Sequence, residues 1–168
     1  YLRRTNDPWR MDEIYKKVKG QRMYLYRAVD SEGNTIDFYL SKTRDAKSAK
    51  HFFKKALASS HVPQPRVITV DKNPAYPVAI QTLKEEKRMP EGIQLRQRKY
   101  LNNIMEQDHR FIKKRVRSML GLKSFRTATL ILRGIEAMHM IKKGQLHQRV
   151  NYAQNEVEAI HKLFKLAA

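Results

Sequence analysis

Three runs rich in aromatic and β-branched residues open the chain and are joined by very short connections. The runs cover residues 9–18, 21–29 and 35–40, and the connections contain Gly20 and Gly33. A hairpin turn commonly needs a residue with positive φ, which glycine adopts without steric cost. The sequence therefore predicts a three-stranded antiparallel meander, onto which the rest of the chain must pack.

The spacing of the apolar residues changes after this meander. Residues 49–56 carry apolar side chains at helical spacing, and Asp45 stands where an N-cap would. After Pro63 and Pro65, an almost continuously apolar run at 66–70 is typical of a strand that is covered on both faces. The remaining pattern predicts a helix that starts at Asn73 and Pro74, a weak strand and two long helices, at 73–83, 93–98, 102–116 and 127–143.

This order of elements predicts an α/β fold. Its mixed five-stranded sheet would have three antiparallel strands plus two added through helical crossovers, all flanked by helices. With 168 residues and no internal repeat, the chain suits one domain, which we assign to residues 1–144, followed by a C-terminal helical tail at 145–168. The chain begins at Tyr1 with a strand close behind, so we expect a fragment that has lost an upstream region.

The net charge of the chain indicates what kind of partner it binds. The 35 lysines and arginines against 16 acids give a net charge of +19, which points to a polyanion, with nucleic acid as the first candidate. No run of about 18 apolar residues could span a bilayer, and the start lacks the apolar core of a secretory signal. With no cysteine either, we expect a soluble cytoplasmic protein that has no membrane partner.

Three acids stand at the edges of predicted elements. Asp12 is on the first strand, Asp71 ends the fourth strand, and Glu106 lies in the first turns of the helix after the fifth. Ligands collect at the carboxyl ends of strands in open α/β sheets, so the three could converge on one edge. Such carboxylates would repel one another unless divalent cations such as Mg²⁺ occupied the cluster. Taken singly, each acid could instead be a solvated strand, turn or helix residue.

Two metal ions about 3.5 to 4 Å apart can activate a water or a 3′-hydroxyl on one side of a phosphodiester and stabilise the leaving oxygen on the other. In that chemistry the three acids would hold metal and would not act as general acid and base. A basic surface would grip the DNA backbone beside the small acidic pocket.

The helix that carries Glu106 is also strongly basic. Residues three, four and seven positions later share its side of the helix, and these are His109, Arg110 and Lys113. For His109, a solvated or core-edge position remains an open alternative to DNA contact. The stretch from 96 to 126 holds only two acids, Glu106 and Asp108. Against them stand ten basic residues that we interpret as a DNA track: Arg96, Arg98, Lys99, Arg110, Lys113, Lys114, Arg115, Arg117, Lys123 and Arg126.

The residues around the three acids resemble a known family. They read Asp-Pro-Trp-Arg-Met-Asp-Glu, Val-Ile-Thr-Val-Asp and Tyr-Leu-Asn-Asn-Ile-Met-Glu-Gln-Asp-His-Arg, with 34 residues between Asp71 and Glu106. In this order they are similar to the three catalytic blocks of Asp-Asp-Glu (DDE) transposases, in particular the insertion-sequence-six family of bacteria. The likeness covers residues 7–144.

The resemblance implies an RNase H-like catalytic domain, related to retroviral integrases, that uses Mg²⁺ or Mn²⁺, with two ions expected. Asp12, Asp71 and Glu106 would be its catalytic metal ligands, and Lys113 matches the basic residue that contacts DNA near the scissile bond. Family members cleave at transposon ends and transfer 3′-hydroxyl ends into target DNA, usually as multimers. They commonly carry an upstream helix-turn-helix region that recognises the ends, which this chain lacks.

Arg110, His109, Lys114 and Arg117 complete the residues that we expect to bind DNA. A homodimer or higher multimer on DNA, in the bacterial cytoplasm and on the nucleoid when bound, follows from the same resemblance. Two other functions stay open. One is a DNA-binding module without catalysis, from a truncated or decayed element; the other is a nuclease of the same fold, which would cut DNA without joining it.

Overall fold

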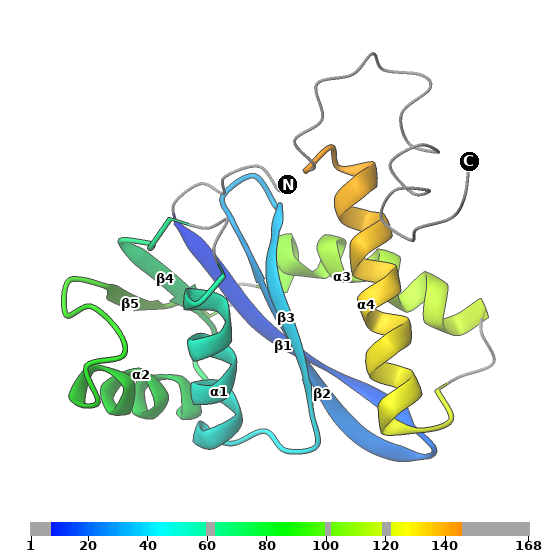
Figure 1. Ribbon diagram of the computed structural model, residues 1–168, viewed down its shortest axis with the longest axis horizontal. Coiled ribbons are helices and arrows are strands. Elements are labelled where there is room, and N and C mark those ends of the chain that lie inside the picture. Colours follow the sequence, from blue (N-terminus) through cyan, green and yellow to red (C-terminus); the bar gives the residue numbers. More distant parts are fainter. Residues whose placement is uncertain (1–7, 60–62, 100–101, 119–121, 146–168) are drawn as a thin grey trace.

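The computed structural model describes residues 8–59, 63–99, 102–118 and 122–145, and only the backbone of 102–108 and 118. Its elements follow the predicted order (Figure 1). The strands are β1 (Trp9–Val18), β2 (Gln21–Val29), β3 (Thr35–Ser41), β4 (Val67–Val70) and β5 (Gln94–Gln97). The helices are α1 (Ala46–Leu57), α2 (Ala75–Glu85), α3 (Asn102–Ser118) and α4 (Phe125–Lys142). The predicted tail at 145–168 lies outside the described residues, except for Gln145.

The five strands form one sheet in the order β3-β2-β1-β4-β5. The first three pair antiparallel, whereas β4 pairs parallel to β1 and β5 parallel to β4, which confirms the predicted mixed sheet. In the β1–β4 pairing Arg10 stands opposite Thr69. Two residues further along each strand come Asp12 and Asp71, so the central pairing of the sheet brings these two acids side by side.

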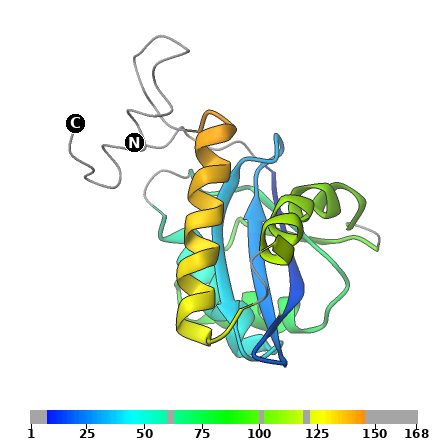
Figure 2. The ribbon, with the colours of Figure 1, turned by 90° about the vertical axis from the view of Figure 1, so that its right-hand side faces the viewer.

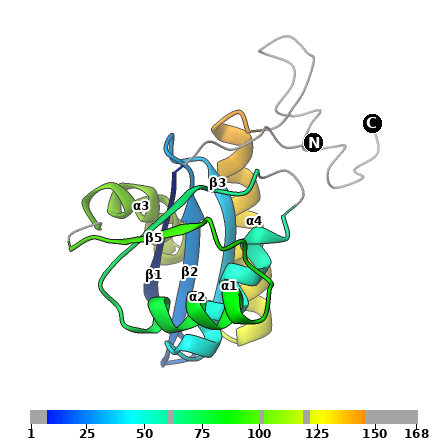
Figure 3. The ribbon, with the colours of Figure 1, turned by 90° about the vertical axis from the view of Figure 1, so that its left-hand side faces the viewer.

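Alternation along β1 divides the core into two layers. Trp9 and Met11 face one apolar cluster, which they share with α1 and α2, while Ile14 and Val18 face a second cluster with α3 and α4. The near side of the sheet carries α3 and α4 in Figure 2 and α1 and α2 in Figure 3. Among the described helices, none has both the length and the apolar character that a bilayer crossing requires.

Side-chain caps set where the helices begin. Asp45 caps α1 as predicted, with its carboxylate accepting from the Ser48 N–H at 2.7 Å. Helix α2 begins at Ala75, one residue later than predicted, and the Asn73 side chain accepts from the Ala75 N–H at 3.0 Å. Helix α4 begins two residues earlier than predicted, because Ser124 forms a capping box with the third residue of the helix.

A fully buried ion pair ties the second helical layer to the sheet. Arg27 on β2 donates from Nε to Glu136 Oε1 at 2.5 Å and from Nη2 to Oε2 at 3.2 Å, and both side chains are 0% exposed. The Thr35 hydroxyl also donates to Glu136 Oε2, at 3.2 Å. The Arg27 guanidinium lies over the Phe111 ring, 5.2 Å from its centre. Arg27 therefore contacts α3 and α4 together.

We expect Arg27→Met to lower the free energy of unfolding by about 3 to 5 kcal/mol, because it leaves Glu136 buried without its cation. Arg133→Met is the matched control, since Arg133 is exposed on α4. Combining Arg27→Met with Glu136→Leu should recover much of the loss, because no buried charge then remains. Urea unfolding followed by circular dichroism measures all three, and equal losses for Arg27→Met and Arg133→Met would contradict the assignment.

Candidate active site

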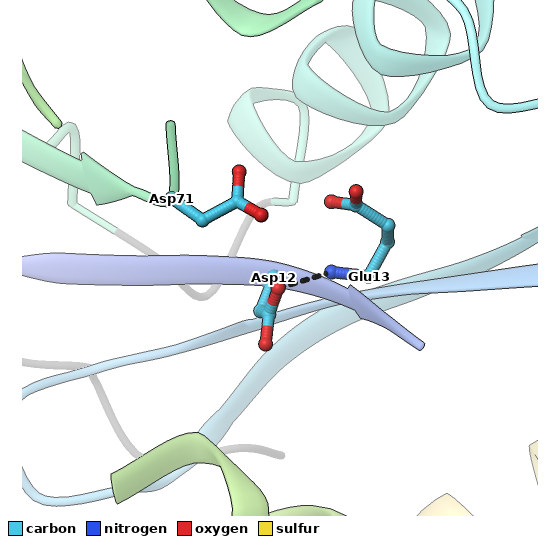
Figure 4. Close-up of side chains that lie close together, drawn as sticks. All are labelled: Asp12, Glu13 and Asp71. Atoms are coloured by element: carbon cyan, nitrogen blue, oxygen red, sulfur yellow. Dashed lines mark hydrogen bonds between the residues drawn. The ribbon is translucent and has the colours of Figure 1, made fainter. Parts of the chain in front are cut away.

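Three carboxylates meet where β1 passes the end of β4. Asp12, Glu13 and Asp71 each offer one oxygen, and these oxygens lie within 4.8 Å of one another. Figure 4 shows Glu13 and Asp71 on one side of β1, while Asp12 leaves the strand on the other. One Asp12 oxygen, Oδ1, turns back and accepts from the Glu13 N–H at 2.8 Å (Figure 4). The structure thus brings together two of the three predicted acids and adds Glu13.

Asp12 is buried in an unfavourable place for its charge. Its exposed fraction is 6%, and burial, followed by the charge of Glu13, raises its pKa from 3.8 to about 7. The nearby charge of Asp71 raises the pKa further, although the hydrogen bond from Glu13 N–H opposes the shift. A divalent cation would stabilise the ionised form, and grouped carboxylate oxygens are the donors that Mg²⁺ and Mn²⁺ prefer. The donor set therefore fits a divalent metal.

Glu13 is held by three donors from other parts of the fold. Its side chain is 2% exposed. Oε1 accepts from Arg44 Nε and from Asn73 Nδ2, the latter at 3.0 Å, and Oε2 accepts from the Tyr76 hydroxyl. Both oxygens are thus engaged, so Glu13 is better suited to fix the surrounding loops than to bind metal.

Arg44 reaches both Glu13 and Asp71. Its Nη2 lies 3.7 Å from Asp71 Oδ2, while its Nε donates to Glu13. The other Asp71 oxygen accepts from the Asn73 N–H at 2.9 Å, which fixes the turn between β4 and α2. Asp71 keeps 26% of its side chain exposed, so this acid stays accessible while one guanidinium and one turn hold it in place.

Glu106 lies in α3, as predicted, but its side chain is outside the described residues. Three residues later, His109 Nε2 lies 3.9 Å from Asp12 Oδ2. Residues three apart share one side of a helix, so the position of Glu106 is on the side of α3 that faces Asp12.

His109 is part of the core edge. It is 1% exposed, and neither ring nitrogen has a hydrogen-bond partner within the part of the chain that the structure describes. Burial first, and then the charge of Arg27, lower its pKa from 6.5 to about 3, so the ring is neutral and its contact with Asp12 is no ion pair. Of the two roles that the sequence left open, this burial favours the core-edge position over direct contact with DNA.

The other residues predicted to bind DNA gather on one side of α3. All of them are exposed, and they line an open hollow of about 500 Å³. The lining residues are Arg110, Lys113, Lys114 and Arg117. Since the side chains that line this hollow among the described residues are all basic, an anion such as a DNA phosphate would be favoured there.

The network around Glu13 was not predicted from the sequence. An acid next to Asp12 on a strand must leave on the opposite face, so the Asp-Glu pair was a readable signal that the two carboxylates have different surroundings. Arg44 and Tyr76 gave no such signal. They meet Glu13 across 31 and 63 residues of chain, and no local pattern encodes contacts of that kind.

Comparisons with known proteins cover most of the chain. A DDE domain family model matches residues 6–145. The chain is 43% identical over 136 residues to the transposase for insertion sequence-like element IS431mec of Staphylococcus aureus (strain Mu50 / ATCC 700699). It is equally similar to the transposase for insertion sequence element IS257 in transposon Tn4003 of Staphylococcus aureus. Each alignment covers 80% of this chain but 58% of the relative, so the chain spans little more than half of these proteins.

Among solved structures, the chain is similar to the HTLV-2 integrase catalytic core domain in complex with magnesium. The TM-score is 0.59 at 18% identity, over 85% of this chain and 89% of that chain. At that identity the likeness speaks for the fold alone. It confirms the predicted RNase H-like fold of the retroviral integrase type.

The raised pKa of Asp12 predicts how stability depends on pH without metal. The unfolded carboxyl ionises near 3.8 and the folded one near 7, so folding becomes less favourable as the pH rises between these values. Asp12→Asn cannot ionise. The free energy of unfolding of this variant, relative to that of the unchanged chain, should therefore increase as the pH rises through this range. The increase should reach at most roughly 4 kcal/mol and then stay constant.

Urea unfolding in EDTA across this pH range measures the gain. Glu91→Gln is the control, because Glu91 is exposed and its replacement should give no such trend. A gain from Asp12→Asn that falls as the pH rises would contradict the burial of this charge.

Tyr76→Phe tests the Glu13 network. Tyr76 is 1% exposed and its hydroxyl donates to Glu13, so removing the hydroxyl should cost about 1 to 3 kcal/mol of stability. Tyr15→Phe makes the same chemical change at a residue that is 60% exposed, and should have little effect. Thermal or urea unfolding compares the two variants, and the network would be of no consequence if they behaved alike.

Proposed function

The chain belongs to the DDE domain family of insertion-sequence transposases, and from this premise we propose that it is the catalytic domain of a DNA transposase. In this proposal it cleaves DNA at transposon ends and transfers the 3′-hydroxyl ends into target DNA. The observation that carries it is the meeting of Asp12 and Asp71 on neighbouring strands, beside the helix that holds Glu106.

Asp12, Asp71 and Glu106 would hold two metal ions, either Mg²⁺ or Mn²⁺. When bound, these ions activate the attacking hydroxyl and stabilise the leaving oxygen of the phosphodiester. The fold of the chain holds these ligands in position. The sheet fixes Asp12, whereas Arg44 and the Asn73 N–H fix Asp71.

The basic hollow on α3 would hold the DNA strand. Arg110, Lys113, Lys114 and Arg117 lie on the helix that also carries Glu106, so phosphates bound there would run past the acid cluster. Contacts of this kind give affinity that falls steeply with salt and carries little sequence information. Selection of the transposon ends would then belong to a region outside this chain.

The partners would be transposon ends and target DNA, and joining paired ends would need a homodimer or a higher multimer. The place of action would be the bacterial cytoplasm, on the nucleoid while DNA is bound. These statements follow from membership of the family, and a DNA partner accords with the net charge of +19.

A strand-transfer assay with pre-cleaved DNA ends and Mg²⁺ or Mn²⁺ tests the proposal. Asp71→Asn and Glu106→Gln should each slow the reaction by more than about a hundredfold, because several kcal/mol of charge stabilisation depend on the metal ligands. Glu91→Gln, an exposed acid on the loop after α2, should react at the unchanged rate.

The products decide between the remaining functions. Joined products that depend on metal and on both acids support the transposase. Cut but unjoined DNA would indicate a nuclease of the same fold. Salt-sensitive DNA binding without any reaction, and with Mn²⁺ affinity unchanged after substitution of the acids, would indicate a DNA-binding module without catalysis.

A further inference from the structure

Lys16 lies on the face of β1 that α3 covers. It shares this face with Asp12, Ile14 and Val18, and the last two belong to the apolar cluster under α3 and α4. Lys16 is 9% exposed, which is unusual for a lysine on a strand next to a turn. Its aliphatic stem is therefore enclosed, at a distance of about 13 Å from Asp12 along the strand.

Among the described residues, no acid balances the charge of Lys16. None of the ion pairs or hydrogen bonds among the described residues involves it. Its pKa is lowered from 10.5 to about 8, first by burial and then by the charge of Lys113 on α3. The positive charge of Lys113 thus acts on Lys16, and an enclosed charge without a counter-charge is costly for the fold.

Lys113 belongs both to this pair and to the basic hollow. The charges of both lysines also act on His109, whose ring lies next to Asp12. Asp12 and Lys16 share the face of β1 that α3 covers, so a DNA strand that is bound in the hollow and reaches the acids would run near both lysines.

We propose that Lys16 and Lys113 together bind one backbone phosphate of a DNA strand, in a site formed where β1 meets α3. The proposal rests on the function proposed above, and it adds a residue from the sheet to a DNA surface that otherwise lies on one helix. A phosphate there removes the repulsion between the two ammonium groups and supplies the missing negative charge. Lysine binds phosphate as a point charge, so the site holds the strand without reading its sequence.

The test compares neighbouring lysines on opposite faces of β1. Lys16→Met keeps the apolar stem and removes the charge, while Lys17→Met makes the same change at an exposed residue on the other face. Binding of the 168-residue chain to a labelled DNA duplex of random sequence is measured in EDTA at several salt concentrations. Lys16→Met should reduce the slope of log affinity against log salt by about 0.9, and Lys17→Met should leave it unchanged.

Two further variants sharpen the result. Lys16→Arg keeps the charge and should keep the slope. The double variant of Lys16→Met and Lys113→Met should lose less affinity than the sum of the single losses, because both residues contact one phosphate. Urea unfolding of each variant shows whether a change in binding comes from a change in folding.

Either of two results overturns the site. An equal effect of Lys16→Met and Lys17→Met would mean that only net charge matters. A slope that is unchanged by Lys16→Met, together with a gain in stability, would mean that Lys16 is only a strained buried charge. Because EDTA prevents the reaction, the binding result stands apart from catalysis, and a chain that binds as expected but joins no DNA would overturn the transposase and keep the phosphate site.

Discussion

The buried pair of Arg27 and Glu136 is the interaction on which the rest of the arrangement depends. Replacing such a pair by apolar residues often leaves stability unchanged or improves it, so its value here lies in geometry. Two hydrogen bonds fix α4 against β2, and the same guanidinium also holds α3 because it lies over the Phe111 ring. Since α3 carries Glu106 and His109, and Arg27 stands opposite Asp12 in the pairing of β1 with β2, the distance between this helix and Asp12 is set from the neighbouring strand.

Successive side chains of β1 point to opposite faces of the sheet, and this gives Asp12 and Glu13 different roles at the candidate site. Asp12 leaves β1 toward α3, where chemistry on DNA is proposed, while Glu13 leaves toward the loops that precede α1 and α2. The network of Glu13, Arg44 and Tyr76 therefore supports Asp71, which Arg44 also contacts. Arg44 offsets part of the negative charge of the acidic cluster locally.

Much of this could be predicted because it follows from periodicity and chain order. The alternation in β1, the apolar run before Asp71 and the helical spacing after Asn102 were enough to place two acids on neighbouring strands and Glu106 on a helix. The partners of Glu13 could not be predicted, since Arg44 and Tyr76 come from distant loops and helices. Lys16 stood in the same alternating pattern as Asp12. Its burial could not be predicted, because it depends on the position of α3 against β1, and no local pattern gives that position.

The position of β1 at the centre of the sheet also bears on how the chain folds. On one side, β1 pairs with β2 through a tight turn, so that half of the sheet can form from contacts close in sequence. On the other side it pairs with β4, which arrives only after α1, and such distant parallel pairing is slow to form. Asp12 and Asp71 belong to opposite sides of this divide. The cluster therefore assembles only when the two halves have joined, so a partly synthesised chain cannot yet form it.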